Sequence, residues 1–200
     1  MSHYKKEWKE KASIDYFPHF LALWVGFNSW YNDHYKNYNL STDRAHIEKI
    51  KSEFIAPTNE IYDNFSMLIN SHDNKSIAFK SYIESLYYAL DQNQTLFYRN
   101  TKKLLSFHNL KYGGKYDDVV YGRQNFHDLQ NNDESYLNFN FFEFDNVIFK
   151  CEQQELFAGI LEIIYQVRCS LVHGIIDPNN NNYHDIVKYC YYILYALMQE

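Results

Sequence analysis

The segment from Tyr165 to Gly174 holds the residues best suited to acid–base chemistry in this chain of 200 residues. Arg168 ends an apolar stripe of a predicted helix, where a permanent charge is costly without a partner. His173 follows, and its imidazole titrates near neutral pH. At ~100° per residue these two side chains would point ~140° apart on a continuous helix. They can face one site only if the helix ends near His173, and Gly174 stands where a C-cap glycine would be.

Two other interpretations of this segment are open. In the first, Arg168 pairs with an acid on another helix and His173 caps the carbonyl groups at the end of its own helix. The spacing alone favours this structural interpretation. In the second, Cys169 and His173 lie four residues apart on a helix and bind zinc, with His184 and Cys190 near them. No second paired set of ligands is evident in the sequence. We therefore expect a buried thiol at Cys169, no metal and no cofactor.

Arg168, four intervening residues and His173, at the end of the penultimate predicted helix, resemble the R-x4–6-H motif of the HEPN superfamily. Residues 14–35 and 155–198 also resemble the first core helix and the closing helices of bacterial HEPN-like proteins. The resemblance covers the two ends of the chain and does not reach the middle. It implies a helical bundle that dimerises and brings both copies of the motif into one cleft.

The resemblance further implies a metal-independent endoribonuclease, a toxin or defence effector that cleaves RNA through its 2′-hydroxyl. Such cleavage needs a base, an acid and a cation that offsets charge in the transition state. Arg168 would bind phosphate and His173 would transfer protons. Active members commonly carry Asn, Asp or His after the arginine, whereas this chain has Cys169 and then Ser170, which could supply a polar contact. The alternative is a non-catalytic HEPN-like module that binds RNA, a nucleotide or a protein partner. A toxin would have an antitoxin protein as its partner.

The most basic stretch of the chain contains Arg99, Lys102 and Lys103, with tyrosines among and beyond them. Interleaved basic and aromatic side chains suit single-stranded RNA, through phosphate contacts and base stacking. A solvent-exposed helix face produces the same pattern and is the simpler interpretation. These three residues are our candidates for RNA binding.

The composition favours helices as the elements that position these residues. Six glycines and three prolines leave few breaks, which disfavours a β-sandwich or barrel. Asn28 is a polar residue on a very apolar helix, and it either bonds within the core, which we favour, or orients the motif. Apolar residues at three- and four-residue spacing predict an all-α, up-and-down bundle with helices near 17–31, 43–54, 58–68, 73–91, 95–110, 152–173 and 183–198.

The predicted helix at 152–173 is apolar on two sides. This pattern is typical of a helix that is central in a bundle or shared with a partner chain. Together with the resemblance, it leads us to expect a homodimer.

Residues 111–150 break the helical pattern with glycines and polar runs. The aromatic segment 139–149 alternates in part, which predicts a short β-hairpin about Asp145 and Asn146. Forty residues cannot easily bury a core of their own. We therefore predict one HEPN-like domain over 1–200, with 111–150 as an irregular insertion between helices.

Charge and cysteine content limit the class of protein. A net charge of −6 argues against an unspecific nucleic-acid coat and leaves room for a local basic site. Three cysteines without a CxxC pair predict reduced thiols. The uncharged stretch 16–32 is interrupted by polar residues, lacks a cleavage site and falls short of the ~20 apolar residues that span a bilayer. We expect a cytoplasmic protein without a membrane segment.

Overall fold

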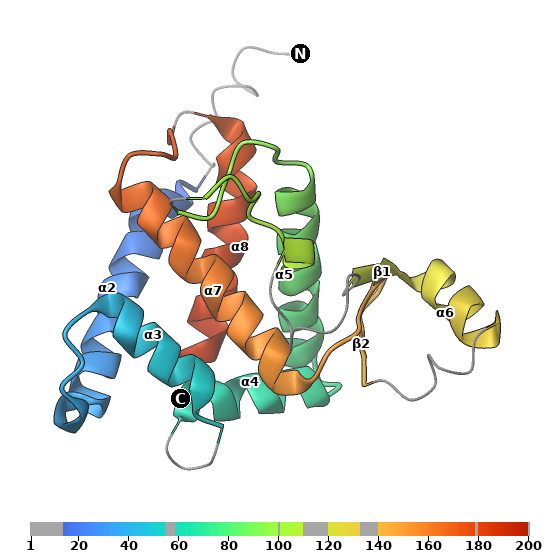
Figure 1. Ribbon diagram of the computed structural model, residues 1–200, viewed down its shortest axis with the longest axis horizontal. Coiled ribbons are helices and arrows are strands. Elements are labelled where there is room, and N and C mark those ends of the chain that lie inside the picture. The colour runs from blue at the N-terminus through green and yellow to red at the C-terminus, as the bar shows by residue number, and fades with distance from the viewer. Residues whose placement is uncertain are drawn as a thin grey trace.

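Helices dominate the computed structural model, as the sequence predicts (Figure 1). The structure describes residues 14–54, 59–99, 101–109, 120–132, 140–178 and 180–199. The helices of the bundle are α2 (Tyr16–His34), α3 (Asp43–Ser52), α4 (Glu60–Asn70), α5 (Asn74–Asp91), α7 (Gln153–Val172) and α8 (Asn181–Leu197). Short 3-10 helices occupy Lys36–Tyr38 and Phe107–Asn109.

Side-chain caps set where several of these helices begin. Asp15 caps α2, Thr42 caps α3 and Asp73 caps α5, each by accepting a backbone N–H from the first turn. The helix that we predicted from Thr58 begins at Glu60 instead, because the side chain of Asn59 caps it. Thr58 itself lies outside the described residues.

The centre of the bundle is α8, which packs against α2, α4, α5 and α7 (Figure 1). Burying an aliphatic side chain stabilises a fold by about 1.5–3 kcal/mol. The face of α8 that the spacing places inward is fully buried, and we infer that this helix organises much of the core. Its buried side chains include Ile186, Cys190, Ile193, Leu194 and Leu197.

Two sides of α7 are apolar because the chain itself covers both of them. Both predicted stripes are buried, from Leu156 and Phe157 to Ile164 and Val167. This helix packs against α3, α4 and α8, and the segment 95–109 lies close to its C-terminal half (Figure 1). The two-sided pattern thus reflects a central helix and does not by itself require a partner chain.

The helix predicted over 95–110 is wrong. A tight loop takes its place, in which Phe97 and Leu104 form an isolated antiparallel bridge. The backbone of this segment bonds across the loop instead, from the N–H of Tyr98 to the carbonyl of Lys103 at 2.9 Å and from the N–H of Leu105 to the carbonyl of Leu96 at 2.7 Å. At the start of the loop, the buried side chain of Asn93 accepts the backbone N–H groups two and three residues further along.

A small antiparallel sheet forms within the predicted insertion. Its strands are β1 (Val120–Gly122), β2 (Phe142–Glu143) and β3 (Val147–Phe149), in the order β1-β3-β2. The hairpin predicted about Asp145 and Asn146 is therefore confirmed by the pairing of β2 with β3. Strand β1 and the helix α6 (Arg123–Asn132) were not predicted. The remainder of the insertion lies outside the described residues.

The carboxylate of Glu84 attaches this sheet to the bundle. Glu84 is a buried residue of α5. Its oxygens accept the backbone N–H groups of Asp145 and Asn146 at 3.1 and 3.2 Å, and the side-chain amide of Asn146 at 2.9 Å. A buried carboxylate with three donors is satisfied, so the β2–β3 turn has a fixed place against α5.

Candidate functional site

The end of α7 is built as the sequence predicts. Gly174 adopts a positive φ of 66°. Its N–H group and that of Ile175 bond back to carbonyls of the last helical turn at 3.1 and 2.8 Å. This arrangement is a Schellman motif, which leaves Val172 as the last helical residue. His173 therefore stands at the point where the chain leaves the helix.

The guanidinium of Arg168 is held between a carboxylate and an aromatic ring. Its Nη2 lies 2.8 Å from Oδ2 of Asp43, and its side chain remains 21% exposed. The guanidinium carbon lies 5.5 Å from the ring centre of Trp24, a cation–π contact. Its Nε is buried without a hydrogen-bond partner among the described residues. Arg168 thus keeps a fixed orientation while part of its charge stays open to solvent.

Asp43 is in turn held by α2. Its Oδ1 accepts hydrogen bonds from the Tyr31 hydroxyl at 3.0 Å and from Nδ2 of Asn28 at 3.1 Å. Burial, and then the hydrogen bond to Asp43, raise the pKa of Tyr31 well above its ordinary value. The hydroxyl therefore stays protonated at neutral pH and remains a donor. Asn28 reaches the motif through Asp43 and does not contact Arg168 directly.

The structural interpretation of Arg168 is confirmed in its first part, since an acid on another helix pairs with it. The sequence analysis identified neither Asp43 nor Trp24 as a partner of Arg168. The available signal was the uncompensated charge of Arg168, which predicts an acidic partner. It does not predict which acid the fold brings there.

His173 lies on a different side of α7 from Arg168. Its side chain is exposed. Over the five residue steps from Arg168 to His173, a regular helix turns by ~140° about its axis and rises by ~7.5 Å. No hydrogen bond or ion pair joins the two residues in the described part of the chain. The described part of the chain therefore does not show the two functional groups in contact.

The predicted supporting residues Cys169 and Ser170 face the interior, with exposures of 2% and 3%. The Tyr165 hydroxyl shares a hydrogen bond with Cys169, and burial followed by this bond raises the pKa of Tyr165 to about 12. Cys169 and the exposed His173 thus lie in different environments. Within the described ranges, no group of three or more His, Cys, Asp or Glu side chains could hold a metal ion.

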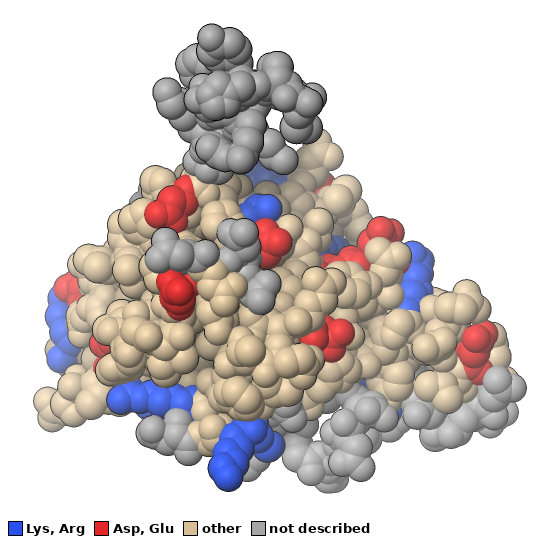
Figure 2. Space-filling view, turned by 90° about the horizontal axis from the view of Figure 1, so that it is seen from above, with Lys and Arg blue, Asp and Glu red and all other residues tan. Residues whose placement is uncertain are grey.

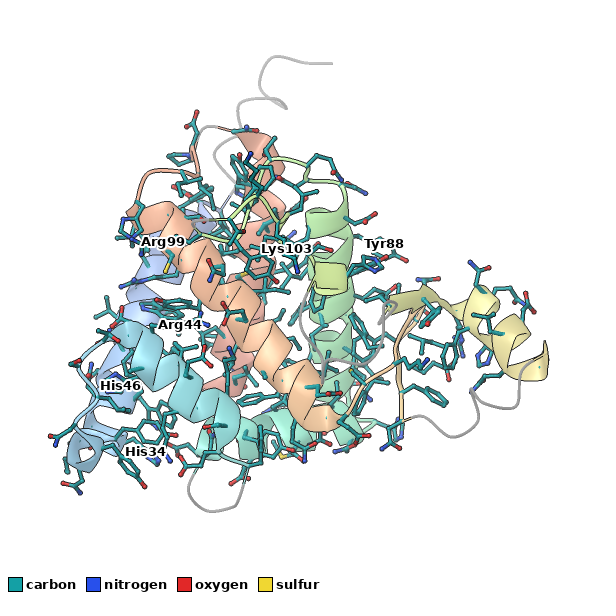
Figure 3. All side chains as sticks on the ribbon, viewed as in Figure 1. His34, Arg44, His46, Tyr88, Arg99 and Lys103 are labelled. Carbon is teal, nitrogen blue, oxygen red and sulfur yellow. The ribbon has the colours of Figure 1, made fainter. Side chains whose placement is uncertain are left out.

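A second charged cluster lies nearly two turns before Arg168 on α7. Glu162 accepts hydrogen bonds from Arg44 at 2.7 Å, from Lys51 at 2.8 Å and from Gln166 at 2.8 Å. Burial alone would raise the pKa of Glu162, but these three hydrogen bonds outweigh it and hold the pKa below its ordinary value. Arg44 lies beside α7 in this cluster (Figure 3).

One of the three predicted RNA-binding residues is attached to α7. The backbone N–H of Arg99 donates to Oε1 of Gln166 at 3.1 Å, and its side chain is exposed. Gln166 and His173 are seven residues apart, so they share a helix face. Lys102 and Lys103 are exposed as well, and Lys103 lies farther toward α5 (Figure 3). The predicted basic stretch therefore approaches the helix that carries the motif.

Charged side chains are scattered over the face shown in Figure 2. Basic and acidic groups occur singly among larger uncharged areas, and this view shows no broad basic patch among the described residues. Tight unspecific binding of nucleic acid draws on many phosphate contacts. This face is suited to a few phosphate contacts at most.

Exposed aliphatic side chains occur on α2, which carries Trp24, and at the end of α7, which carries Arg168. Leu21 and Val25 are 37% and 68% exposed, and they adjoin the ring on α2 that contacts Arg168. Val172 and Ile175, at the end of α7, are 54% and 53% exposed. We call these four residues the apolar rim.

No helix in the described parts of the chain has the length and apolar character to cross a membrane. Comparisons with protein-family models, with curated proteins and with solved structures give no match for this chain.

Proposed function

We propose that the chain is a metal-independent endoribonuclease whose site combines Arg168 of one copy with His173 of a second. The observation that supports this best is the state of Arg168, which is fixed by Asp43 and Trp24 yet 21% exposed. An accessible imidazole follows at the end of the same helix. The apolar rim beside Arg168 is the surface on which the second copy would pack.

In this proposal the RNA supplies its own nucleophile. The His173 imidazole takes the proton of a ribose 2′-hydroxyl, and that oxygen attacks the adjacent phosphorus. The imidazolium so formed gives this proton to the leaving 5′-oxygen. Arg168 offsets the negative charge that builds on the phosphoryl oxygens. The bond from phosphorus to the 5′-oxygen breaks, so the products carry 2′,3′-cyclic phosphate and 5′-hydroxyl ends.

The first prediction concerns His173. We expect His173→Ala to lower the rate of RNA cleavage in EDTA by about 10²–10⁴-fold, the usual contribution of a general acid or base. The exposed position of His173 predicts an unchanged melting temperature. Cleavage is measured on labelled RNA, with analysis of the product ends and with DNA of the same sequence as a substrate that should not be cut.

His72→Ala is the matched control, because His72 is an exposed histidine in the turn between α4 and α5. We expect it to cleave at the wild-type rate. Equal rates for His173→Ala and wild type would overturn the proposal. Activity that EDTA abolishes and zinc restores would do the same.

A non-catalytic RNA-binding module is the second candidate, and two observations favour it. The charge of Arg168 is already paired with Asp43, and Cys169 is buried where active members commonly carry a polar residue. RNA binding by purified wild-type protein without any cleavage would support this function. An antitoxin partner stays a prediction.

A further inference from the structure

We infer that Asp43 is the positioning residue for Arg168, and that Tyr31 and Asn28 fix the Asp43 carboxylate for this purpose. The inference deepens the proposed function and rests on it. Asp43 would not touch the RNA. It would act by holding the guanidinium of Arg168 in the orientation that a phosphate needs.

The two carboxylate oxygens of Asp43 contact different groups. Oδ2 contacts Arg168 through Nη2, while Oδ1 accepts from the neutral donors Tyr31 and Asn28. Within the described residues, the ion pair with Arg168 uses one terminal nitrogen. A two-pronged pair would occupy the edge of the guanidinium that binds phosphate. The observed contact joins Nη2 to a single carboxylate oxygen, so Asp43 can hold Arg168 without replacing a substrate phosphate.

One face of α2 fixes both the cation and its carboxylate. Trp24, Asn28 and Tyr31 are spaced at four and seven residues, which places them on the same side of the helix. Trp24 lies against Arg168, and the other two bond to Asp43. Tyr31 is fully buried and stacks on His46 with ring centres 4.8 Å apart. Tyr31 and Asn28 therefore have little freedom to move, and their hydrogen bonds hold the Asp43 carboxylate in one orientation.

This arrangement separates a positioning role from a merely stabilising one. Removing the charge of Asp43 lets the guanidinium rotate, and a small misplacement of a catalytic group can cost about 10²-fold in rate. The same change removes a negative charge beside the phosphate, so RNA binding should not weaken. A loss of folded protein would instead lower the rate and the amount of bound RNA together.

The test compares cleavage with binding in Asp43→Asn. We expect kcat to fall by about 10–100-fold, while the Kd for a 2′-O-methyl RNA that cannot be cleaved stays equal or becomes tighter. Tyr31→Phe should lower kcat in the same direction by a smaller factor. Asp33→Asn is the control, since Asp33 is an exposed acid of α2, the helix that carries Tyr31. We expect it to leave kcat and Kd unchanged.

A double variant decides whether Asp43 acts through Arg168. Adding Asp43→Asn to Arg168→Ala should cause no further loss of cleavage, because the group that Asp43 positions is gone. A full additional loss in that background would overturn the inference. So would an unchanged kcat in Asp43→Asn.

A readout without catalysis separates this inference from the proposed function. The Nε–H of Arg168 is buried, so its NMR signal should exchange slowly with water in the wild type and at least tenfold faster in Asp43→Asn. If the wild type cleaves no RNA, the ribonuclease proposal fails. The exchange rate of the Nε–H still tests whether Asp43 holds Arg168 in place. Equal exchange in both proteins would overturn the inference even in an active enzyme.

Discussion

Single charged residues on α7 depend on partners from other helices. Arg168 relies on Asp43 of α3, and Glu162 relies on Arg44 and Lys51 of the same helix α3. Glu162 has the more enclosed carboxylate, with 12% of its side chain exposed compared with 30% for Asp43. Its three hydrogen bonds compensate for burial, so this residue should matter for stability where Asp43 matters for orientation.

We expect Glu162→Gln to lower the free energy of unfolding by about 1.5–3 kcal/mol, the range for hydrogen bonds to charged groups. Chemical denaturation at pH 7 measures the change. Glu48→Gln is the control, because Glu48 bonds to the same two cations but its side chain is 48% exposed. Exposed ion pairs contribute about 0–1 kcal/mol, so a larger loss in the control than in Glu162→Gln would contradict the argument.

The lowered pKa of Glu162 gives this contribution a pH dependence. The stabilisation from a depressed carboxylate pKa is fully present above the unfolded value of about 4.3 and is lost as the pH falls through the folded value. The difference in stability between wild type and Glu162→Gln should therefore be constant near pH 6–7 and shrink below about pH 4. A difference that grows on acidification would contradict the assignment.

The sequence predicted part of the candidate site. The permanent charge of Arg168 at the end of an apolar stripe predicts a partner for it, and Gly174 predicts the end of the helix. Both predictions need only the residues within one segment of the chain. Asp43 was not identified as the partner, since its position beside Arg168 depends on how α3 crosses α7. The packing of helices against one another produces contacts of this kind, and the spacing of residues along one helix does not predict them.

At the scale of elements, strong apolar periodicity made the helices of the bundle predictable. The prediction failed where bonds across a loop or weak stripes decided the outcome. Over 95–110 the backbone bonds join Tyr98 to Lys103 and Leu105 to Leu96, and the spacing of apolar residues does not predict such bonds. In α6, Phe126 is the one fully buried apolar side chain described, so its stripe was too short to recognise.

The attachment of the small sheet to α5 gives a prediction at this scale. Glu84→Gln replaces an acceptor of three hydrogen bonds by an amide whose NH2 group cannot accept from the N–H groups of Asp145 and Asn146. We expect backbone amides of β3 to exchange with solvent about tenfold faster or more, as the hairpin opens more often. Hydrogen exchange with mass spectrometry measures this.

Glu143→Gln is the control for Glu84→Gln, since Glu143 is a partly exposed residue of β2 that pairs with Arg123. We expect little change in exchange for this variant. We also expect wild-type RNA cleavage from Glu84→Gln, because its contacts lie on the turn of the small sheet and not at the end of α7. Protection in β3 that survives the loss of Glu84 would show that the turn is held by other contacts.

At the scale of the whole molecule, the separation of Arg168 and His173 raises the question of how many copies of the chain form one site. Both apolar stripes of α7 are covered within the chain, so they do not indicate an interface. We propose the apolar rim as the contact between two copies. It adjoins Arg168 and the end of α7, so a symmetric pair that meets there would bring each His173 toward the Arg168 of the other copy.

Mixing two inactive variants tests this arrangement. Arg168→Ala keeps its His173, and His173→Ala keeps its Arg168. Each should be nearly inactive alone. After co-expression about half of the random pairs contain both variants, and each such pair retains one Arg168 opposite one His173 from the other chain. We therefore expect cleavage by the mixture to exceed that of either variant by tenfold or more. A site within one chain would show no recovery.

The recovery should depend on the apolar rim. Adding Val25→Asp to both variants places a charge in the contact, which costs several kcal/mol if it is buried unpaired, and the pairs should separate. We expect light scattering to show a monomer and the recovered cleavage to be lost. Met67→Asp is the matched control, because Met67 is 60% exposed on α4, away from the end of α7. Recovery that persists with Val25→Asp, or is lost equally with Met67→Asp, would place the contact between copies elsewhere on the molecule.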